Sequence, residues 1–270
     1  MIKLVVSDID GTLVDQSEEL REPAFRMVSW LRERGVLFTL ATGRVQGMAE
    51  KYAEKLGIAV PYVASNGASL ILNGKAIRRD TVPLRPLEEM ILRADALGLS
   101  VIYSPDGYER VQRVTPFILG QQRAFSRYFH VEPLTRQDFA TGQIEKLCLM
   151  DDDRTGRIEE IARMAAVLPG AYGFTRYGDR AVEIVRGGAT KASGVRELAR
   201  LLGVSLSEVL TAGDDENDLE MLSEAGVGVT VQNALPKVKA RASYVASQPT
   251  AAGVFEAVRR YTDENSEKEA

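Results

Sequence analysis

The sequence predicts an α/β protein built on a doubly wound parallel sheet, with a second, α+β region inserted into it. Short apolar segments alternate with longer amphipathic segments from residue 1 to about residue 68, and the same alternation resumes after about residue 188. Between these stretches the order of the segments is mixed. Alternating strands and helices are typical of a parallel sheet with helices on both faces. We therefore expect a core of residues 1–82 and 188–262 around an inserted domain, 83–187.

The first part of the chain predicts strand, helix, strand, helix and strand. Its strands are continuous apolar runs, as in sheets covered on both faces, and Pro23 and Gly35 mark the two ends of the first helix. The expected elements are a strand at 2–7, a helix at 23–34, a strand at 36–41, a helix at 46–56 and a strand at 62–65. Asn73-Gly74 between two alternating runs then predicts a hairpin.

The inserted region predicts three helices and four strands. We expect the helices at 87–97, 117–128 and 156–168, and the strands at 99–103, 144–150, 172–176 and 181–185. After it the first pattern returns, with helices expected at 192–202, 217–225, 234–239 and 252–261 and strands at 209–212, 227–231 and 244–246. The end of the chain, 263–270, is charged and almost without apolar residues, which predicts a frayed tail.

Composition and charge exclude several classes of protein. The 270 residues are 45% apolar, which is enough for a buried core. Basic and acidic residues number 34 and 38, and no basic stripe is present, so a nucleic-acid partner is not expected. The N-terminus lacks the features of a signal peptide and no long apolar run occurs, which predicts a cytoplasmic protein without a membrane partner. Nothing in the sequence predicts an oligomeric state.

The chain holds one cysteine and one histidine. Cys148 alone cannot form an intramolecular disulfide or a thiolate cluster, and His130 alone cannot build a multi-histidine zinc site. A serine or cysteine nucleophile normally needs a base, usually histidine. We expect Cys148 to be a small apolar residue on a strand and His130 to be a partly buried structural residue.

Four polar clusters share one position, directly after an expected parallel strand. They are SDIDGT at 7–12, TGR at 42–44, SNG at 65–67 and GDDEND at 213–218. In open α/β sheets, ligands bind at the carboxyl ends of the strands, so these clusters are expected to meet in one crevice. Ser65, Asn66 and Gly67 could shape its floor or simply make a turn, and Arg44 could be an ion-pair partner or a ligand.

Such a crevice would gather four carboxylates, those of Asp8, Asp10, Asp214 and Asp218. Crowded negative charges are costly unless they protonate or a divalent cation lies among them, and an all-oxygen ligand set favours Mg²⁺. Thr42 offers a hydroxyl and, with Gly43, backbone N–H groups near a helix N-terminus, and Lys191 lies in a glycine-flanked segment, so all three could bind a phosphate.

An ionised aspartate needs no general base at neutral pH. Asp8 could therefore attack phosphorus directly and form an aspartyl-phosphate, which accounts for the scarcity of histidine. Asp10 lies two residues further on, displaced by the turn at Gly11, and could protonate the leaving oxygen and then activate water.

In order and setting, DIDGT, the threonine of ATGR, the lysine of TKASG and GDDEND resemble the four motifs of the haloacid dehalogenase superfamily. SNGA, the Asn-Gly hairpin and the late segment VQNALPKVKARASYVA are similar to those of its Cof-type, C2-capped (class IIB) phosphatases. The resemblance implies a Rossmann-like core with an inserted C2 cap domain.

The resemblance also implies a role for each matching residue. Asp8 is the expected nucleophile and Asp10 the acid/base, and Mg²⁺ would be held by the Asp8 carboxylate, the Asp10 backbone carbonyl and Asp214. Phosphoryl-binding residues would be Thr42, Gly43, Lys191 and Asn217. Asp218 would either support the metal ligands from the next layer of residues or be an additional metal carboxylate, although DEND could also be a helix cap. Small phosphorylated metabolites, sugar phosphates first, are the expected substrates.

The sequence offers three alternatives to hydrolysis. A phosphotransferase or phosphomutase would use the same aspartyl-phosphate and offer it to a second hydroxyl. A glycosyltransferase would use Asp8-Ile9-Asp10 to bind metal, but this leaves TGR, Lys191 and GDDEND without a role. A catalytically silent binding module finds no support, because each expected carboxylate is present. Selectivity is expected from the inserted domain, where Arg176, Tyr177, Glu183 and Arg186 could reach a substrate.

Overall fold

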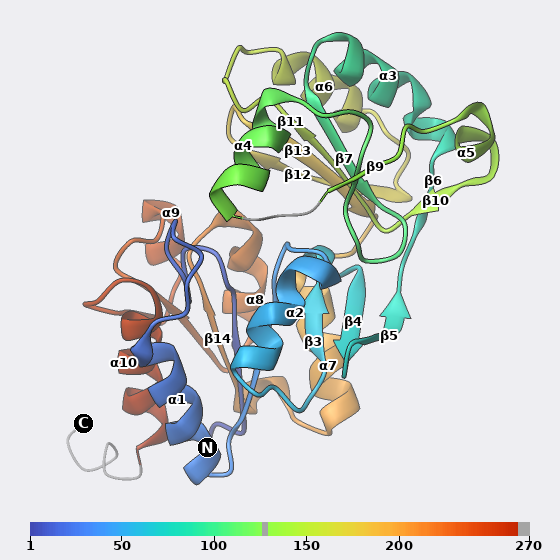
Figure 1. Ribbon diagram of the computed structural model, residues 1–270. Coiled ribbons are helices and arrows are strands. Elements are labelled where there is room, and N and C mark those ends of the chain that lie inside the picture. The colour runs from blue at the N-terminus through green and yellow to red at the C-terminus, as the bar shows by residue number, and fades with distance from the viewer. Residues whose placement is uncertain (126–128, 264–270) are drawn as a thin grey trace. The chain divides into compact units, whose positions relative to one another are not determined.

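The computed structural model describes residues 1–125 and 129–263, which form two compact units (Figure 1). We call Met1–Arg44, Ala49–Arg78 and Thr190–Ala270 the core unit, and Val45–Met48 with Arg79–Ala189 the inserted unit. The predicted tail beyond residue 263 and the last three residues of the helix predicted at 117–128 lie outside the described residues.

The core unit is built on a five-stranded parallel sheet of order β16-β15-β14-β1-β2. Its strands are β1 (Leu4–Ser7), β2 (Leu37–Leu40), β14 (Val209–Gly213), β15 (Val227–Thr230) and β16 (Tyr244–Val245). The chain runs outward from β1 to β2 on one side and from β14 to β16 on the other, so the order reverses between β1 and β14. Their carboxyl ends are neighbours, because Ser7 pairs with Ala212.

A second, smaller sheet continues the core unit beyond β2. It contains β3 (Tyr62–Ala64), β4 (Ser69–Leu72) and β5 (Lys75–Arg79), and a parallel bridge from Ala41 to Val63 links it to the end of β2. Asn73 and Gly74 both have positive φ, 49° and 72°, which a tight hairpin turn requires. The predicted hairpin is confirmed.

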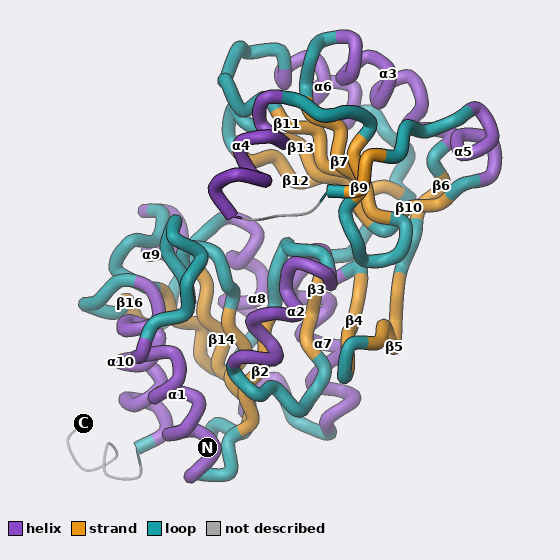
Figure 2. Tube along the Cα trace, viewed as in Figure 1, coloured by secondary structure: helices purple, strands orange, loops and turns teal. Residues whose placement is uncertain are grey.

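Helices cover both faces of the parallel sheet, as Figure 2 shows by colour. One face carries α1 (Glu22–Glu33), α2 (Gln46–Lys55), α9 (Pro236–Lys239) and α10 (Thr250–Thr262), and the other carries α7 (Lys191–Leu202) and α8 (Leu219–Glu224). Successive side chains of a strand point to opposite faces. Accordingly Val5 packs with Met27 of α1, whereas Leu4 and Val6 pack with Leu198 of α7. The predicted doubly wound α/β core is confirmed.

The inserted unit contains a six-stranded, mostly antiparallel sheet of order β12-β13-β11-β7-β8-β9. Its strands are β7 (Ser100–Ser104), β8 (Arg110–Val111), β9 (His130–Val131), β11 (Lys146–Met150), β12 (Tyr172–Tyr177) and β13 (Ala181–Arg186). One face packs against α3 (Glu88–Ala96) and α6 (Ile158–Ala166), and α4 (Pro116–Phe125) contributes Ile118 to the other.

Short elements of the inserted unit differ from the sequence-based expectation. The strand predicted at 144–150 is interrupted at Glu145, which separates β10 (Gln143–Ile144), paired with β6 (Val82–Pro83), from β11. The helix α5 (Arg136–Thr141) begins at a Thr135 capping box and was not predicted. Single-turn 3₁₀ segments occur at Arg85–Leu87 in the inserted unit and at Ser65–Gly67, Leu206–Glu208 and Glu216–Asp218 in the core unit. Elements of two to six residues are too short for a periodic pattern.

The predictions for the single cysteine and the single histidine had different outcomes. Cys148 is buried on β11, as predicted. The prediction of a partly buried His130 is wrong, because its side chain is 58% exposed on β9, at the edge of the sheet, 3.7 Å from Glu132. In the described residues, no helix is both long enough and apolar enough to span a bilayer.

Candidate active site

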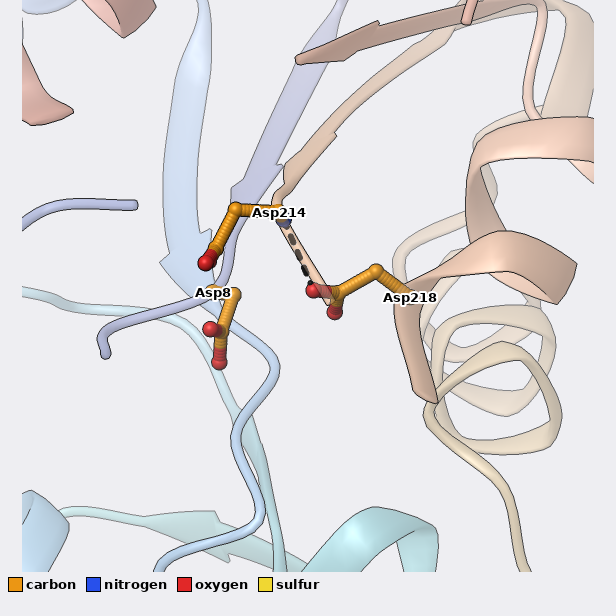
Figure 3. A group of neighbouring side chains, drawn as sticks. All are labelled: Asp8, Asp214 and Asp218. Atoms are coloured by element: carbon orange, nitrogen blue, oxygen red, sulfur yellow. Dashed lines mark hydrogen bonds between the residues drawn. The ribbon is translucent and has the colours of Figure 1, made fainter. Parts of the chain in front are cut away.

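The acidic motifs meet where the chain order of the core sheet reverses. Asp8 follows β1 directly and Asp214 follows β14 directly, while Asp218 comes from the loop after β14 (Figure 3). One carboxylate oxygen from each of the three lies within 4.8 Å of the other two. Residues more than 200 positions apart thus converge because β1 and β14 are hydrogen-bonded neighbours in register.

Asp8 is a buried carboxylate next to a lysine. Its residue surface is 4% exposed, and one carboxylate oxygen lies 2.7 Å from Lys191 Nζ. Burial raises the pKa of Asp8 well above its ordinary value; Lys191 opposes this, and the charges of Asp218, Asp10 and Asp214 add to it. The site therefore holds more negative charge than its lysine neutralises.

Lys191 is the first residue of α7, and its position is set by a helix cap. The Thr190 side chain accepts the Ser193 N–H, and the Ser193 hydroxyl accepts the Thr190 N–H, which fixes the first turn. Lys191 Nζ lies 2.7 Å from both Asp8 Oδ1 and Asp218 Oδ1. Burial lowers the pKa of Lys191, but the two carboxylates outweigh it and raise the pKa above its ordinary value, so the ammonium stays charged.

Asp214 is held against the turn that follows Asp8. The Thr12 hydroxyl donates to Asp214 Oδ1 at 2.5 Å. Gly11 has a φ of 77°, and a side chain there would collide with the Asp214 carboxylate, so both the turn and the close approach require glycine. Burial raises the pKa of Asp214 to about 7. From the sequence Thr12 was expected only to be part of the turn with Gly11, and its bond to Asp214 was not predicted.

Asp218 already has partners on both carboxylate oxygens. Oδ1 accepts from Lys191 Nζ at 2.7 Å. Oδ2 accepts the backbone N–H of Asp214 at 2.9 Å, which Figure 3 shows, and that of Asp215 at 3.1 Å. Asp215 also forms a capping box with Asp218 at the 3₁₀ turn Glu216–Asp218. The predicted cap is confirmed, and the same carboxylate also orients the lysine, which was not predicted.

Thr42 and Gly43 follow β2. Thr42 is fully buried, and its hydroxyl accepts the Arg44 N–H at 3.1 Å. The Thr42 N–H donates to the Val63 carbonyl at 3.0 Å, so the expectation that this N–H binds phosphate does not agree with the structure. The threonine hydroxyl keeps its proton for donation.

Asn217 is joined to the loop after β3. Its side-chain amide donates to Asn66 Oδ1 at 3.0 Å, and the Asn66 N–H donates to the Thr42 carbonyl at 3.0 Å. The three residues Ser65, Asn66 and Gly67 all have positive φ, 51°, 52° and 95°. Such sparsely populated backbone persists where surrounding structure imposes it, often at functional sites. Of the two predictions for SNG, the turn is confirmed, and the hydrogen bond from Asn217 to Asn66 joins that turn to the site.

Asp10 lies at the rim of this group, with a side chain that is 54% exposed. Arg44 donates to it through two nitrogens, so Arg44 is an ion-pair partner of Asp10. Asn233, in the late segment VQNALPK, donates to the Gly11 carbonyl at 2.7 Å and so holds the turn after Asp10. No role was predicted for Asn233, and only its membership of that segment pointed to it.

Comparison with known proteins places this geometry in a family. The profile of the haloacid dehalogenase-like hydrolases matches residues 5–258. A phosphoglycolate phosphatase of Methanothermobacter thermautotrophicus is 25% identical over 260 residues, which cover 96% of this chain and 99% of that protein. An HMP-PP phosphatase of Shigella boydii is 26% identical over 246 residues, covering 89% of this chain and 92% of that protein.

The fold is also shared with solved structures. A haloacid dehalogenase-like hydrolase from Bacteroides thetaiotaomicron has a TM-score of 0.84, with 23% identity and coverage of 97% of this chain and 100% of that chain. The resemblance that the motifs predict is confirmed. The chain belongs to the family of haloacid dehalogenase-like hydrolases.

Proposed function

We propose that the chain is a Mg²⁺-dependent phosphatase of small phosphomonoesters, such as sugar phosphates, that works through an aspartyl-phosphate on Asp8. The observation that carries this proposal is the group of Asp8, Asp214 and Asp218 around the buried ammonium of Lys191. Family membership and two relatives named as phosphatases, at 25% and 26% identity over most of the chain, support phosphatase activity.

The donor atoms of the site fit a divalent cation. Asp8 and Asp214 offer carboxylate oxygens, and burial together with repulsion from neighbouring carboxylates raises the pKa of both, a cost that a bound cation removes. We propose that these two carboxylates and the Asp10 backbone carbonyl hold Mg²⁺, the hard ion that such oxygen ligands favour. When bound, the ion neutralises negative charge on the phosphoryl oxygens.

The residues of the chain account for both halves of the reaction. The Asp8 carboxylate attacks phosphorus while the bond from phosphorus to the ester oxygen breaks, and Asp10 gives that oxygen a proton. Asp10, now ionised, takes a proton from water as the water oxygen attacks the phosphorus of the aspartyl-phosphate. The acyl-phosphate bond breaks, inorganic phosphate leaves and Asp8 returns to a carboxylate.

Four residues are proposed to hold the phosphoryl group. Lys191 supplies a fixed positive charge, and Asp218 keeps it in place through the 2.7 Å contact. Thr42 supplies a hydroxyl, and Gly43 and Asn217 complete the pocket floor with Asn66, to which Asn217 is hydrogen-bonded. Asp218 then acts mainly by orienting the lysine, because both of its oxygens are engaged.

We further propose that residues 83–187 act as a cap domain that selects the substrate. The side chains of this region carry no pattern that identifies one metabolite. Screening the purified protein against a broad panel of phosphoesters would find the preferred class, and transfer to added hydroxyl acceptors would reveal any mutase activity.

Hydrolysis of a generic aryl phosphate tests the proposal. The wild type should lose activity in excess chelator and regain it with Mg²⁺, and Asp8→Asn should be inactive because an amide cannot form the acyl-phosphate. Asp15→Asn is a matched control, since Asp15 is an exposed aspartate of the same segment that pairs with Arg21. Activity that persists in chelator, or in Asp8→Asn, would rule out the proposal.

A further inference from the structure

Arg44 forms a two-pronged ion pair with the carboxylate of Asp10. Nε donates to Asp10 Oδ2 at 2.8 Å and Nη2 donates to Oδ1 at 2.6 Å. Two parallel charge-assisted bonds fix the plane of a carboxylate as well as its distance. The orientation of the Asp10 side chain is therefore set by the position of the guanidinium.

Further contacts hold the Arg44 guanidinium in place. Arg44 is 6% exposed, its Nη2 lies 3.0 Å from Glu18 Oε1, and it lies over the Tyr52 ring at 5.1 Å from the ring centre. The Tyr52 hydroxyl donates to the Glu18 carbonyl at 3.0 Å, which secures Glu18 in a backbone conformation with a φ of 58°. The Arg44 guanidinium is thus already held in the position from which its two nitrogens bind Asp10.

The two partners differ in burial, and this difference separates two explanations. If the ion pair only compensated a buried charge, Asp10 would be buried too, but its side chain is 54% exposed and water could solvate it. A buried, immobilised arginine holding a half-exposed carboxylate is an arrangement for orientation.

We propose that Arg44 is the positioning residue for Asp10, holding its carboxylate in the orientation from which it transfers the proton to the leaving oxygen and accepts the proton of water. This inference deepens the function proposed above and rests on it. No bond to Arg44 forms or breaks; the proton moves between Asp10, the ester oxygen and water.

The proposal predicts a particular dependence on the leaving group. A weakly basic leaving group such as dinitrophenolate departs without a proton, whereas phenolate and alkoxides need one. Since kcat/KM reports the steps up to the first irreversible one, it isolates phosphoryl transfer to Asp8 from the later attack of water. Misplacing Asp10 should lower kcat/KM only for substrates whose leaving groups need protonation.

The experiment measures kcat/KM for a series from dinitrophenyl phosphate to phenyl phosphate and an alkyl phosphate. In Arg44→Lys, which cannot form the two-pronged bond, we expect a loss of about 10- to 100-fold for phenyl and alkyl phosphates and of less than about threefold for dinitrophenyl phosphate. With dinitrophenyl phosphate, kcat should fall and a burst of dinitrophenolate should appear, because the second step also needs Asp10.

Three further proteins complete the experiment. Asp10→Asn should show the same pattern with larger losses, and Asp10→Asn combined with Arg44→Lys should lose nothing more, since the arginine acts through the aspartate. Arg21→Lys is the control, because Arg21 also pairs with an aspartate, Asp15, but through one nitrogen only and on the exposed surface, and its series should equal the wild type. Glu18→Gln weakens the ion pair that holds the Arg44 guanidinium, so it should give a weaker version of the Arg44→Lys pattern. This variant replaces Arg44→Lys in the experiment if Arg44→Lys does not fold.

A uniform loss across the series in Arg44→Lys, or losses that add to those of Asp10→Asn, would overturn the proposal and leave Arg44 a structural residue. These outcomes are distinct from failure of the proposed function, in which the wild type would hydrolyse none of the series or Asp8→Asn would remain active.

Discussion

Both units of the protein bury charged side chains, but the two groups differ in balance. In the inserted unit, Glu183 lies 2.5 Å from Lys146, and Glu145 lies 2.8 Å from Arg79. In the core unit, three carboxylates gather around the single ammonium of Lys191. In both groups, removing charge from water costs free energy. Only in the inserted-unit group is each acid paired with its own cation.

The difference indicates which group is built for structure and which for chemistry. A buried acid and base of opposite charge largely neutralise each other. An excess of buried carboxylates instead lowers the stability of the fold until a cation binds. Proteins keep such costly arrangements mainly where a ligand or a reaction uses them.

The largest effect should come from removing the lysine of each group. Lys191→Met should lower kcat/KM for an aryl phosphate by about 10²- to 10³-fold, because a fixed charge that stabilises the transferred group is lost. Glu183 could reach a substrate on the evidence of the sequence, but in the structure it is paired with Lys146, and we assign it to that ion pair. The double variant Lys146→Met/Glu183→Gln, which removes a balanced pair, should therefore stay near the wild type. Steady-state kinetics on both proteins checks this, and equal losses would mean that the two groups do not differ in role.

Neutralising one carboxylate should change stability in opposite directions in the two units. In chelator, Asp214→Asn should raise the free energy of unfolding by about 1 to 2 kcal/mol by relieving repulsion, at the cost of activity. Glu183→Gln should lower it by about 2 to 4 kcal/mol, because Lys146 loses the carboxylate beside it. Urea unfolding followed by circular dichroism measures both, and a shift of the same sign in the two variants would contradict the comparison.

The cost of burying the Asp214 carboxylate should also appear in the pH dependence of the free energy of unfolding. Burial raises the pKa of Asp214 from 3.8 to about 7, so between these values the folded chelated protein binds a proton that the unfolded chain releases. Stability from this group is therefore complete below about pH 4 and is lost as the pH rises through about 7. Subtracting the unfolding profile of Asp214→Asn from that of the wild type should give this decline; parallel profiles would exclude it.

The smallest effects should come from two matched helix caps. Thr190 caps α7 in the core unit and Thr135 caps α5 in the inserted unit, each with a capping box. Replacing either with alanine should lower the free energy of unfolding by about 1 kcal/mol. Thr190→Ala should also lower kcat by roughly three- to tenfold, since it loosens the turn that holds Lys191. An equal effect on kcat in Thr135→Ala would show that the loss reflects stability alone.

The sequence predicts the core unit better than the inserted unit, for a physical reason. Buried parallel strands such as Leu4–Ser7 are continuous apolar runs, and the residues after them are polar because ligands bind there. Short edge strands carry little such information. At β9, two residues supply the whole strand, and whether His130 is buried depends on a neighbouring strand that its own flanking residues do not specify.

In the candidate site, residue types were predictable but pairings were not. Asp8, Lys191 and Asp214 were expected to converge because each stands at the end of a strand or the start of a helix. That Arg44 binds Asp10 through two nitrogens, or that Asn233 holds the Gly11 carbonyl, depends on side-chain directions set by tertiary packing. Even the Thr42 N–H, expected to bind phosphate, is taken by the Val63 carbonyl for this reason.

The most direct test of the proposed role of Asp8 is to trap the phosphorylated protein. Wild-type protein mixed with excess dinitrophenyl phosphate and Mg²⁺ should be quenched in acid within milliseconds, digested, and analysed by mass spectrometry. We expect one phosphoryl group on the peptide that contains Asp8, formed and lost at rates that account for turnover, and none in Asp8→Asn. Full turnover without this peptide, or a phosphoryl group on another residue, would contradict the proposed nucleophile.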